Sequence, residues 1–96
     1  MKHVTPSCPV TQVAKLLSDT WTMLIMRDLN TGPKRFCELE RSLEGISTRT
    51  LTLKLKKLTA ERMIKKSDDG VYTSTERGRG LKIIESAMRR YGERYL

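Results

Sequence analysis

Apolar residues recur every three or four positions along most of the chain, which is the period of amphipathic helices. This spacing predicts four helices before the C-terminal segment, over residues 9–17, 20–29, 35–42 and about 48–62. Asp19 and Ser47 are natural N-caps for the second and fourth of these helices, and the turn-forming residues 30–33 end the second one. The pattern indicates a mainly helical fold.

The predicted helix after Ser47 has two different faces. Leu51, Leu55 and Leu58 form one apolar stripe, which we expect to be buried. At about 100° per residue, the other side presents an outward set: Arg49, Thr52, Leu53, Lys56, Lys57 and Ala60. A short turn containing Gly45 joins this helix to the preceding one, and such a pair of helices is typical of a helix-turn-helix.

Two β-prone runs follow the fourth helix. Residues 64–67 and 71–74 are separated by Asp68-Asp69-Gly70, and an Asp-Gly dipeptide between such runs is a strong signal for a hairpin. This hairpin would lie beside the helices as a wing. The predicted fold class is mainly α with a small β-hairpin, a winged helix-turn-helix.

Residues 76–96 are predicted to form one long last helix capped by Thr75. The apolar residues of this helix are spaced alternately three and four apart, as in a heptad seam: Leu81, Ile84, Met88, Tyr91 and Tyr95. A partner chain explains this seam better than packing within so small a domain. We therefore expect a partner chain to cover the last helix through Leu81, Ile84, Met88 and Tyr91.

Composition and charge narrow the function. The 96 residues are expected to form one domain over residues 1–96. Nineteen Lys and Arg against eleven Asp and Glu give a net charge of +8, and residues 34–66 supply +6 of it. Most of the excess charge therefore lies on the predicted helix-turn-helix, which favours a polyanionic partner such as nucleic acid or an anionic membrane surface.

The start of the helix after Ser47 is the part that meets base edges in a helix-turn-helix protein. Arg49 can make a bidentate contact with guanine, whereas Leu53 can meet a thymine methyl group or pack on a neighbour. At the stem of the wing, Lys65 and Lys66 can reach phosphates, which the acidic tip of the wing would repel. The predicted DNA-binding residues are Lys34, Arg35, Ser47, Thr48, Arg49, Thr52, Leu53, Lys56, Lys65 and Lys66.

The alternative function is a small interaction module whose basic face binds an acidic protein or a membrane, and taken singly these lysines are a solvated helix face. An enzyme is not expected. His3 is the only histidine, and neither a Ser/His/Asp set nor a phosphate-binding loop is present. We expect no metal and no cofactor, and a cytoplasmic location, because residues 1–10 lack the apolar core of a secretory signal.

Several short motifs resemble one known family. They are Cys8-Pro9-Val10, then Trp21, then Gly32-Pro33-Lys34-Arg35-Phe36 followed by Glu38-Leu39, and Gly45-Ile46-Ser47 followed by Arg49 and Leu51. In these motifs the chain resembles the HxlR-type winged helix-turn-helix transcriptional regulators of bacteria. The resemblance implies a homodimer through the first and last helices, and we expect Val10, Val13 and Leu17 to join Leu81, Ile84, Met88 and Tyr91 at this interface. The same resemblance implies that the helix after Ser47 of each subunit lies in a major groove of a palindromic DNA operator. It also implies control of nearby genes, often genes of detoxification or redox metabolism.

Two positions bear on this resemblance. The family has a longer wing and a Tyr-x-Leu-Thr stretch before the last helix, whereas this chain has Ser74 in the leucine position, which affects how the wing packs. Cys8 matches an N-terminal cysteine that senses oxidants or electrophiles in some members, and a helix N-terminus lowers a thiol pKa. The alternative for Cys8 is a small residue at a helix entry, and Cys37 is expected to be a bystander.

Overall fold

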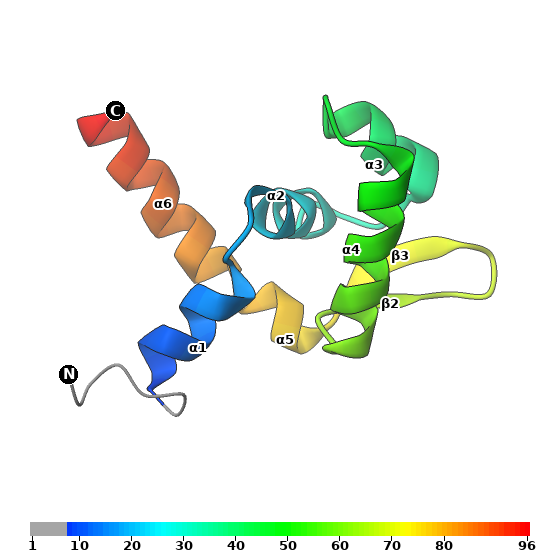
Figure 1. Cartoon of the computed structure of the whole chain (residues 1–96), viewed down its shortest axis with the longest axis horizontal. Helices are drawn as coiled ribbons and strands as arrows, with labels where there is room; N and C mark the ends of the chain where they lie inside the picture. The colour runs from blue at the N-terminus through cyan, green and yellow to red at the C-terminus, as the bar shows by residue number, and fades with distance from the viewer. Residues whose placement is uncertain (1–7) are drawn as a thin grey trace.

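Helices dominate the structure, a computed structural model that describes residues 8–96 (Figure 1). Along the chain the elements are α1 (Pro9–Leu16), α2 (Thr20–Leu29), β1 (Lys34–Arg35), α3 (Phe36–Ser42), α4 (Thr48–Ala60), β2 (Ile64–Lys66), β3 (Val71–Ser74), α5 (Glu76–Arg79) and α6 (Lys82–Tyr95). The predicted fold class, a mainly helical winged helix-turn-helix with a small β-hairpin, is confirmed.

The predicted helix starts are confirmed by the geometry of their caps. Asp19, Ser47 and Thr75 each accept a hydrogen bond from the backbone amide three residues later, at 2.8, 3.0 and 3.2 Å. Each bond satisfies one of the amides that the first turn of a helix leaves without a partner. Three of the helices thus begin where the sequence specifies.

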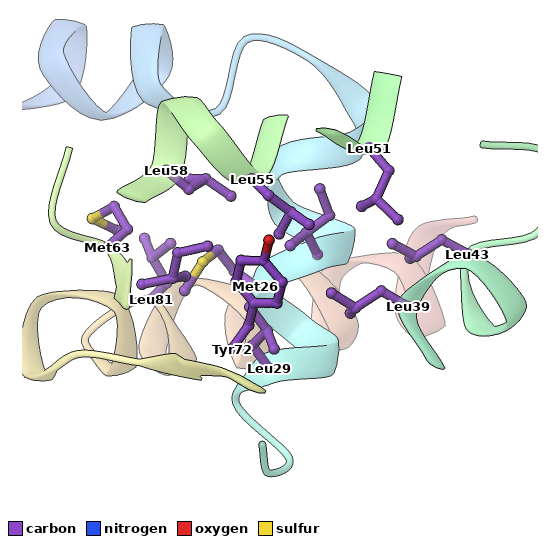
Figure 2. Close-up of a cluster of buried hydrophobic side chains, with 12 residues drawn as sticks. Met26, Leu29, Leu39, Leu43, Leu51, Leu55, Leu58, Met63, Tyr72 and Leu81 are labelled. Atoms are coloured by element: carbon purple, nitrogen blue, oxygen red, sulfur yellow. The ribbon is translucent and has the colours of Figure 1, made fainter. Parts of the chain in front are cut away.

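The hydrophobic core surrounds α2, which lies between the helix-turn-helix and the last helices (Figures 1 and 2). The predicted stripe of α4 is buried, since Leu51, Leu55 and Leu58 are at most 2% exposed. Burying one such side chain contributes about 1.5 to 3 kcal/mol, so this stripe fixes α4 against the core. The other core residues are Ile25, Met26, Leu29, Leu39, Leu43, Met63, Ile64, Tyr72 and Leu81.

The sheet has one strand more than the predicted hairpin. Its order is β1-β3-β2, with both pairs antiparallel, so β3 is the central strand. Lys34 pairs with Tyr72 and Arg35 with Val71. The helix predicted from residue 35 consequently begins one residue later, because Arg35 belongs to the sheet.

Ser74 lies at the position where the family resemblance implies a leucine. The residue is 6% exposed and pairs with Ile64 of β2. The wing therefore forms its hydrogen-bonded strands with a serine at this position.

The last helix is not continuous, which corrects the sequence prediction. It is divided into α5 and α6 at Gly80 and Leu81. A Cβ atom on Gly78 would lie 2.1 Å from the carbonyl oxygen of Met63, so α5 packs against the backbone at a distance that only glycine permits. Leu81 then turns into the core at 5% exposure and is not a residue of an exposed seam.

Candidate nucleic-acid interface

The outward face of α4 is where the sequence predicts it. Thr48, Arg49, Thr52, Leu53 and Lys56 are all exposed. The helix lies at the edge of the molecule, and the β2–β3 hairpin extends beside it (Figure 1). In helix-turn-helix proteins the second helix lies in the major groove of DNA. The exposed polar face of α4, next to the wing, has the geometry that this binding requires.

A left-handed turn sets the wing against α4. Arg62 has φ of 61°, its amide donates to the carbonyl of Thr59 at 3.0 Å, and the amide of Met63 donates to the carbonyl of Leu58 at 3.0 Å. This pair of bonds is a Schellman motif, which closes the helix and reverses the chain. β2 therefore begins directly after the turn, so the wing leaves α4 in a defined direction.

Arg49 is the free cation at the start of α4. It is exposed, and within residues 8–96 no hydrogen bond or ion pair holds its guanidinium group. Two neighbours are already engaged: the Thr48 hydroxyl donates to Glu40 Oε2 at 2.5 Å and the Thr52 hydroxyl donates to the Thr48 carbonyl at 2.8 Å. In this arrangement the threonine oxygens remain available as acceptors, which suits the amino groups of adenine and cytosine.

Lys54 faces the other way and fastens α4 to α2. Its ammonium group lies 3.0 Å from Asp19 Oδ2, and its side chain is 25% exposed. Burial raises the pKa of Asp19, but hydrogen bonds from the hydroxyl and amide of Thr22, together with Lys54, bring that pKa below its usual value. Lys54 thus positions the helix and is not part of its outward charge.

Lys56 and Lys66 approach one groove from opposite sides. The groove, of about 460 Å³, runs between α4 and the wing and is lined by Thr52, Leu55, Lys56, Thr59, Ala60, Lys66 and Tyr72. The Lys66 ammonium lies 5.5 Å from the centroid of the Tyr72 ring, a cation–π distance. Lys65 is also exposed on β2, but consecutive strand residues point to opposite faces of a sheet, so Lys65 does not line this groove.

Lys34 and Arg35 make contacts within the chain. Lys34 Nζ lies 3.3 Å from the Thr31 hydroxyl oxygen and 3.5 Å from the Gly32 carbonyl. Arg35 donates to the Asp69 carbonyl at 2.6 Å and lies 3.8 Å from the Asp69 carboxylate. A hydrogen bond from Ser67 and the charge of Arg35 lower the pKa of Asp69, so β1 partly neutralises the acidic tip of the wing.

The predicted dimer residues fall into three groups. Val10, Val13, Met88 and Tyr91 are exposed by 37 to 76%. Leu17 and Ile84 are half-buried against the core, and Leu81 is inside it. Ile83, which the sequence pattern did not include, is 79% exposed, but at about 100° per residue it lies on a different side of α6 from Met88. Figure 1 shows α1 and α6 on the same side of the molecule.

Cys8 is the N-cap residue of α1 and is half-buried. The amide and hydroxyl of Thr11 and the amide of Val10 lower the pKa of the thiol, outweighing the effect of burial. Cys37, on α3, is a free and exposed thiol. Since α1 and α3 lie at opposite ends of the molecule, the two thiols belong to separate surfaces (Figure 1).

Other site classes receive no support from the described residues. Within residues 8–96, no three His, Cys, Asp or Glu side chains are grouped so that they could hold a metal ion. None of the helices in that range is both long and apolar enough to cross a bilayer. The structure does not describe residues 1–7, which include His3 and most of the segment 1–10 that was searched for a secretory signal.

The exposed basic helix, the turn before it and the adjacent wing define the class: a winged helix-turn-helix DNA-binding domain. A family model, described as HxlR-like helix-turn-helix, matches residues 16–96. The chain belongs to this family of bacterial transcriptional regulators.

Relatives and solved structures agree with this assignment. The chain is 34% identical to the HTH-type transcriptional regulator sll1512 of Synechocystis sp., over 93% of this chain and 70% of that protein. It is 30% identical to the HTH-type transcriptional regulator YodB of Bacillus subtilis, over 92% of this chain and 85% of YodB. The crystal structure of quinone-bound YodB superposes with a TM-score of 0.84, over 92% of this chain and 99% of that one. The structure of the redox regulator HypR in its oxidised form is 29% identical in sequence. It superposes with a TM-score of 0.82, over 93% of this chain and 98% of the HypR chain.

Proposed function

We propose that this chain is a homodimeric, sequence-specific regulator that places α4 of each protomer in a major groove of a palindromic operator. The observation that carries the proposal is the contrast among three cations of β1 and α4. Arg35 and Lys54 are paired with acidic groups of the chain, whereas Arg49 is exposed and unpaired within residues 8–96. Arg49 is therefore the base-reading residue, by a bidentate contact with guanine.

The other predicted contacts have distinct roles in this proposal. Lys56 and Lys66 contact phosphates on the two sides of the groove between α4 and the wing, and Lys65 contacts a phosphate from the other face of the wing. The hydroxyl oxygens of Thr48 and Thr52 accept hydrogen bonds from bases, and Leu53 meets a thymine methyl group. Ser47 contributes through its cap, which holds the first turn of α4. Lys34 and Arg35 reach flanking phosphates only by releasing their contacts within the chain, so they contribute least.

Arg49→Ala tests the base-reading role. We first select the operator from random duplexes with the wild-type protein, then measure affinity for that operator and for scrambled DNA. Loss of the base contact should weaken operator binding by about 1 to 3 kcal/mol and relax base preference. Lys65→Ala is the matched control, because a lost phosphate contact weakens all sequences alike and lowers the salt slope by about one.

Equal weakening of Arg49→Ala on operator and scrambled DNA would contradict base reading by Arg49. Failure to select any sequence, together with tight binding to anionic vesicles or acidic proteins, would contradict the whole function. Sequence-independent electrostatic binding gives no specificity ratio between operator and scrambled duplex.

The dimer forms through α1 and α6, and residues 1–96 act as one DNA-binding domain. The exposed side chains of Val10, Val13, Met88 and Tyr91 support this part of the proposal, with further apolar area from Tyr95. Ile84 and Leu17 are only partly buried and pack against the core, so they connect the proposed interface to the core of the same chain. Two recognition helices must lie about 34 Å apart on DNA, so this interface sets their separation.

Oxidation or an electrophile at Cys8 regulates DNA binding in this proposal. The lowered pKa favours the reactive thiolate, and α1 places the sulfur next to the proposed dimer interface. The related YodB has been crystallised with quinone bound, in a reduced form and after diamide treatment. A disulfide between two Cys8 residues, or between Cys8 and a small thiol, would shift the subunits and misalign one recognition helix with its half-site.

A diamide titration tests the role of Cys8. Operator affinity is measured for the wild type, Cys8→Ser and Cys37→Ser at increasing oxidant. We expect the wild type and Cys37→Ser to change affinity together, while Cys8→Ser stays constant. Identical curves for all three proteins would reduce Cys8 to a structural residue.

A further inference from the structure

One side-chain hydrogen bond connects α3 to the first residue of α4. Thr48 follows the Ser47 cap, and its hydroxyl donates to Glu40 Oε2 at 2.5 Å. Glu40 lies on α3 and is half-buried, whereas Thr48 is exposed. Figure 1 shows α3 next to the start of α4. A side chain of the first helix of the helix-turn-helix is therefore in contact with an exposed residue at the start of the second.

The Glu40 carboxylate is not neutralised by a cation of its own chain. The ion pairs between residues 8 and 96 all involve other acidic side chains. A negative charge beside the N-terminus of α4 stabilises the helix dipole, but it also opposes the approach of a polyanion. Its effect on DNA binding therefore has two parts: a charge that acts on every sequence alike, and a hydrogen bond that acts through Thr48.

The direction of this hydrogen bond decides what Thr48 can offer to a base. A hydroxyl group has one proton and two acceptor lone pairs, whereas an ionised carboxylate can only accept. While Thr48 donates its proton to Glu40, its oxygen can only accept hydrogen bonds from DNA. In the major groove adenine N6 and cytosine N4 are donors, whereas guanine O6 and N7 and thymine O4 are acceptors. Thr48 is therefore restricted to adenine or cytosine.

Thr52 provides a comparison on the same helix. Its hydroxyl donates to the Thr48 carbonyl at 2.8 Å, so its oxygen is also restricted to accepting. That restriction comes from the backbone of α4, and no other side chain imposes it. The restriction on Thr48, in contrast, depends on one replaceable side chain of another helix.

We infer that Glu40 is a positioning residue for base selection: by holding the hydroxyl proton of Thr48, it makes Thr48 specific for adenine or cytosine at one operator position. This inference rests on the proposed function, because it requires the start of α4 to meet base edges. Glu40 acts through Thr48 and does not itself touch DNA. One net hydrogen bond corresponds to a preference of about three- to tenfold between the two classes of base.

Operator duplexes in which each base pair is replaced in turn measure this selection. The operator is first selected with the wild type, and Thr48→Val, which has nearly the same shape without the hydroxyl, identifies the position that Thr48 contacts. There the wild type should prefer adenine or cytosine by about three- to tenfold. Glu40→Gln should reduce this preference to less than about twofold, because glutamine can donate to Thr48 and free the hydroxyl proton for guanine or thymine.

Glu44→Gln is the matched control for the lost charge. Glu44 is exposed in the turn before α4 and makes no ion pair within the described part of the chain. Each glutamine removes one negative charge near the DNA, so both variants should bind all duplexes more tightly. Only Glu40→Gln should change a base preference, and it should leave the preference at the Thr52 position unchanged. Adding Glu40→Gln to Thr48→Val should change no preference further.

The possible outcomes separate this inference from the proposed function. Failure of the wild type to select any sequence would contradict both. An operator that depends on Arg49 would support the proposed function alone if the Thr48 position preferred guanine or thymine, if Thr48→Val changed no position, or if Glu40→Gln kept every preference. Equal weakening of all duplexes by Glu40→Gln, with a lower free energy of unfolding in urea, would reduce the Glu40–Thr48 bond to a structural contact and overturn the inference.

Discussion

The winged unit, residues 20–74, and the outer helices, α1 and α6, are built on different principles. In the winged unit, capped helices, a buried leucine stripe and polar bonds between distant segments fix each element to another. Neither outer helix has a buried residue in the described chain, and both expose large apolar side chains. A single chain therefore completes the winged unit but leaves the outer helices with an apolar surface still to cover.

This difference separates two sources of stability. Changes in the winged unit and at its contact with α5 should alter the unfolding of one chain. Changes on the outer face of α6 should alter association and leave the folded chain intact. Three substitutions test this division, in decreasing order of expected effect.

Gly78→Ala should cause the largest loss of stability. The added Cβ would lie 2.1 Å from the Met63 carbonyl oxygen and 2.8 Å from the end of the Met26 side chain. Overpacking of this kind typically lowers the free energy of unfolding by about 1 to 3 kcal/mol. We expect a loss at the upper end of this range, because the clash is with a backbone atom that cannot move as a side chain can. Urea denaturation of the wild type and the variant measures the difference in their free energies of unfolding.

Gly92→Ala is the matched control for Gly78→Ala. A Cβ at Gly92 meets nothing within 4 Å, so this substitution in α6 should stabilise the helix by up to about 1 kcal/mol. Equal effects of the two alanines would contradict the division between a closed unit and an open helix.

Met88→Glu should weaken the proposed dimer without unfolding the chain. Met88 is 52% exposed on its own chain, and a carboxylate buried in an apolar interface costs about 2 kcal/mol, which corresponds to roughly thirtyfold in dissociation constant. Ile84 is a poorer site for this test, because it packs against the core. Sedimentation equilibrium measures the dissociation constant.

Ser86→Glu is the control for Met88→Glu. Ser86 is exposed on the side of α6 opposite the apolar face, so the same charge there should leave association unchanged. An intact dimer in Met88→Glu would remove this face of α6 from the interface.

Asp19→Asn should have the smallest effect, and that effect should depend on pH. Asparagine keeps the cap of α2 but loses the charge that pairs with Lys54, so at pH 7 the variant should be less stable by under about 1 kcal/mol. The pKa of Asp19 is lower in the folded chain than its unfolded value of about 3.9, so the stabilisation is complete above that pH. It is lost as the pH falls through the folded pKa. A difference that stays constant from pH 7 to pH 2 would exclude the ionised pair as its cause.

Local signals account for what the sequence predicted of the fold. Asp19 and Ser47 cap helices where expected, and the Asp-Gly dipeptide lies in the β2–β3 hairpin. The pattern failed at β1 and at the break before α6. β1 forms by pairing with β3, which is distant in the sequence, and no local periodicity encodes that pairing. At the break, Leu81 is buried in a core that distant segments build.

The candidate site was predictable in its outline but not in its charges. Helical periodicity correctly placed Arg49, Lys56 and the leucine stripe on opposite sides of α4. Counting charges could not show that Arg35 and Lys54 are neutralised by acidic partners, because those partners are distant in sequence.

The central position of β3 has a consequence for the order in which the protein assembles. The β2–β3 hairpin spans a short loop and can close in about 1 to 10 μs, since nearby residues meet quickly. β1 pairs with β3 across the chain of α3 and α4, so this pairing must close a much longer loop and we expect it to form more slowly. The two-residue edge strand is then also the first part of the sheet to open. A molecule that has lost β1 alone would keep its hairpin and α4, but Arg35 would no longer anchor the tip of the wing.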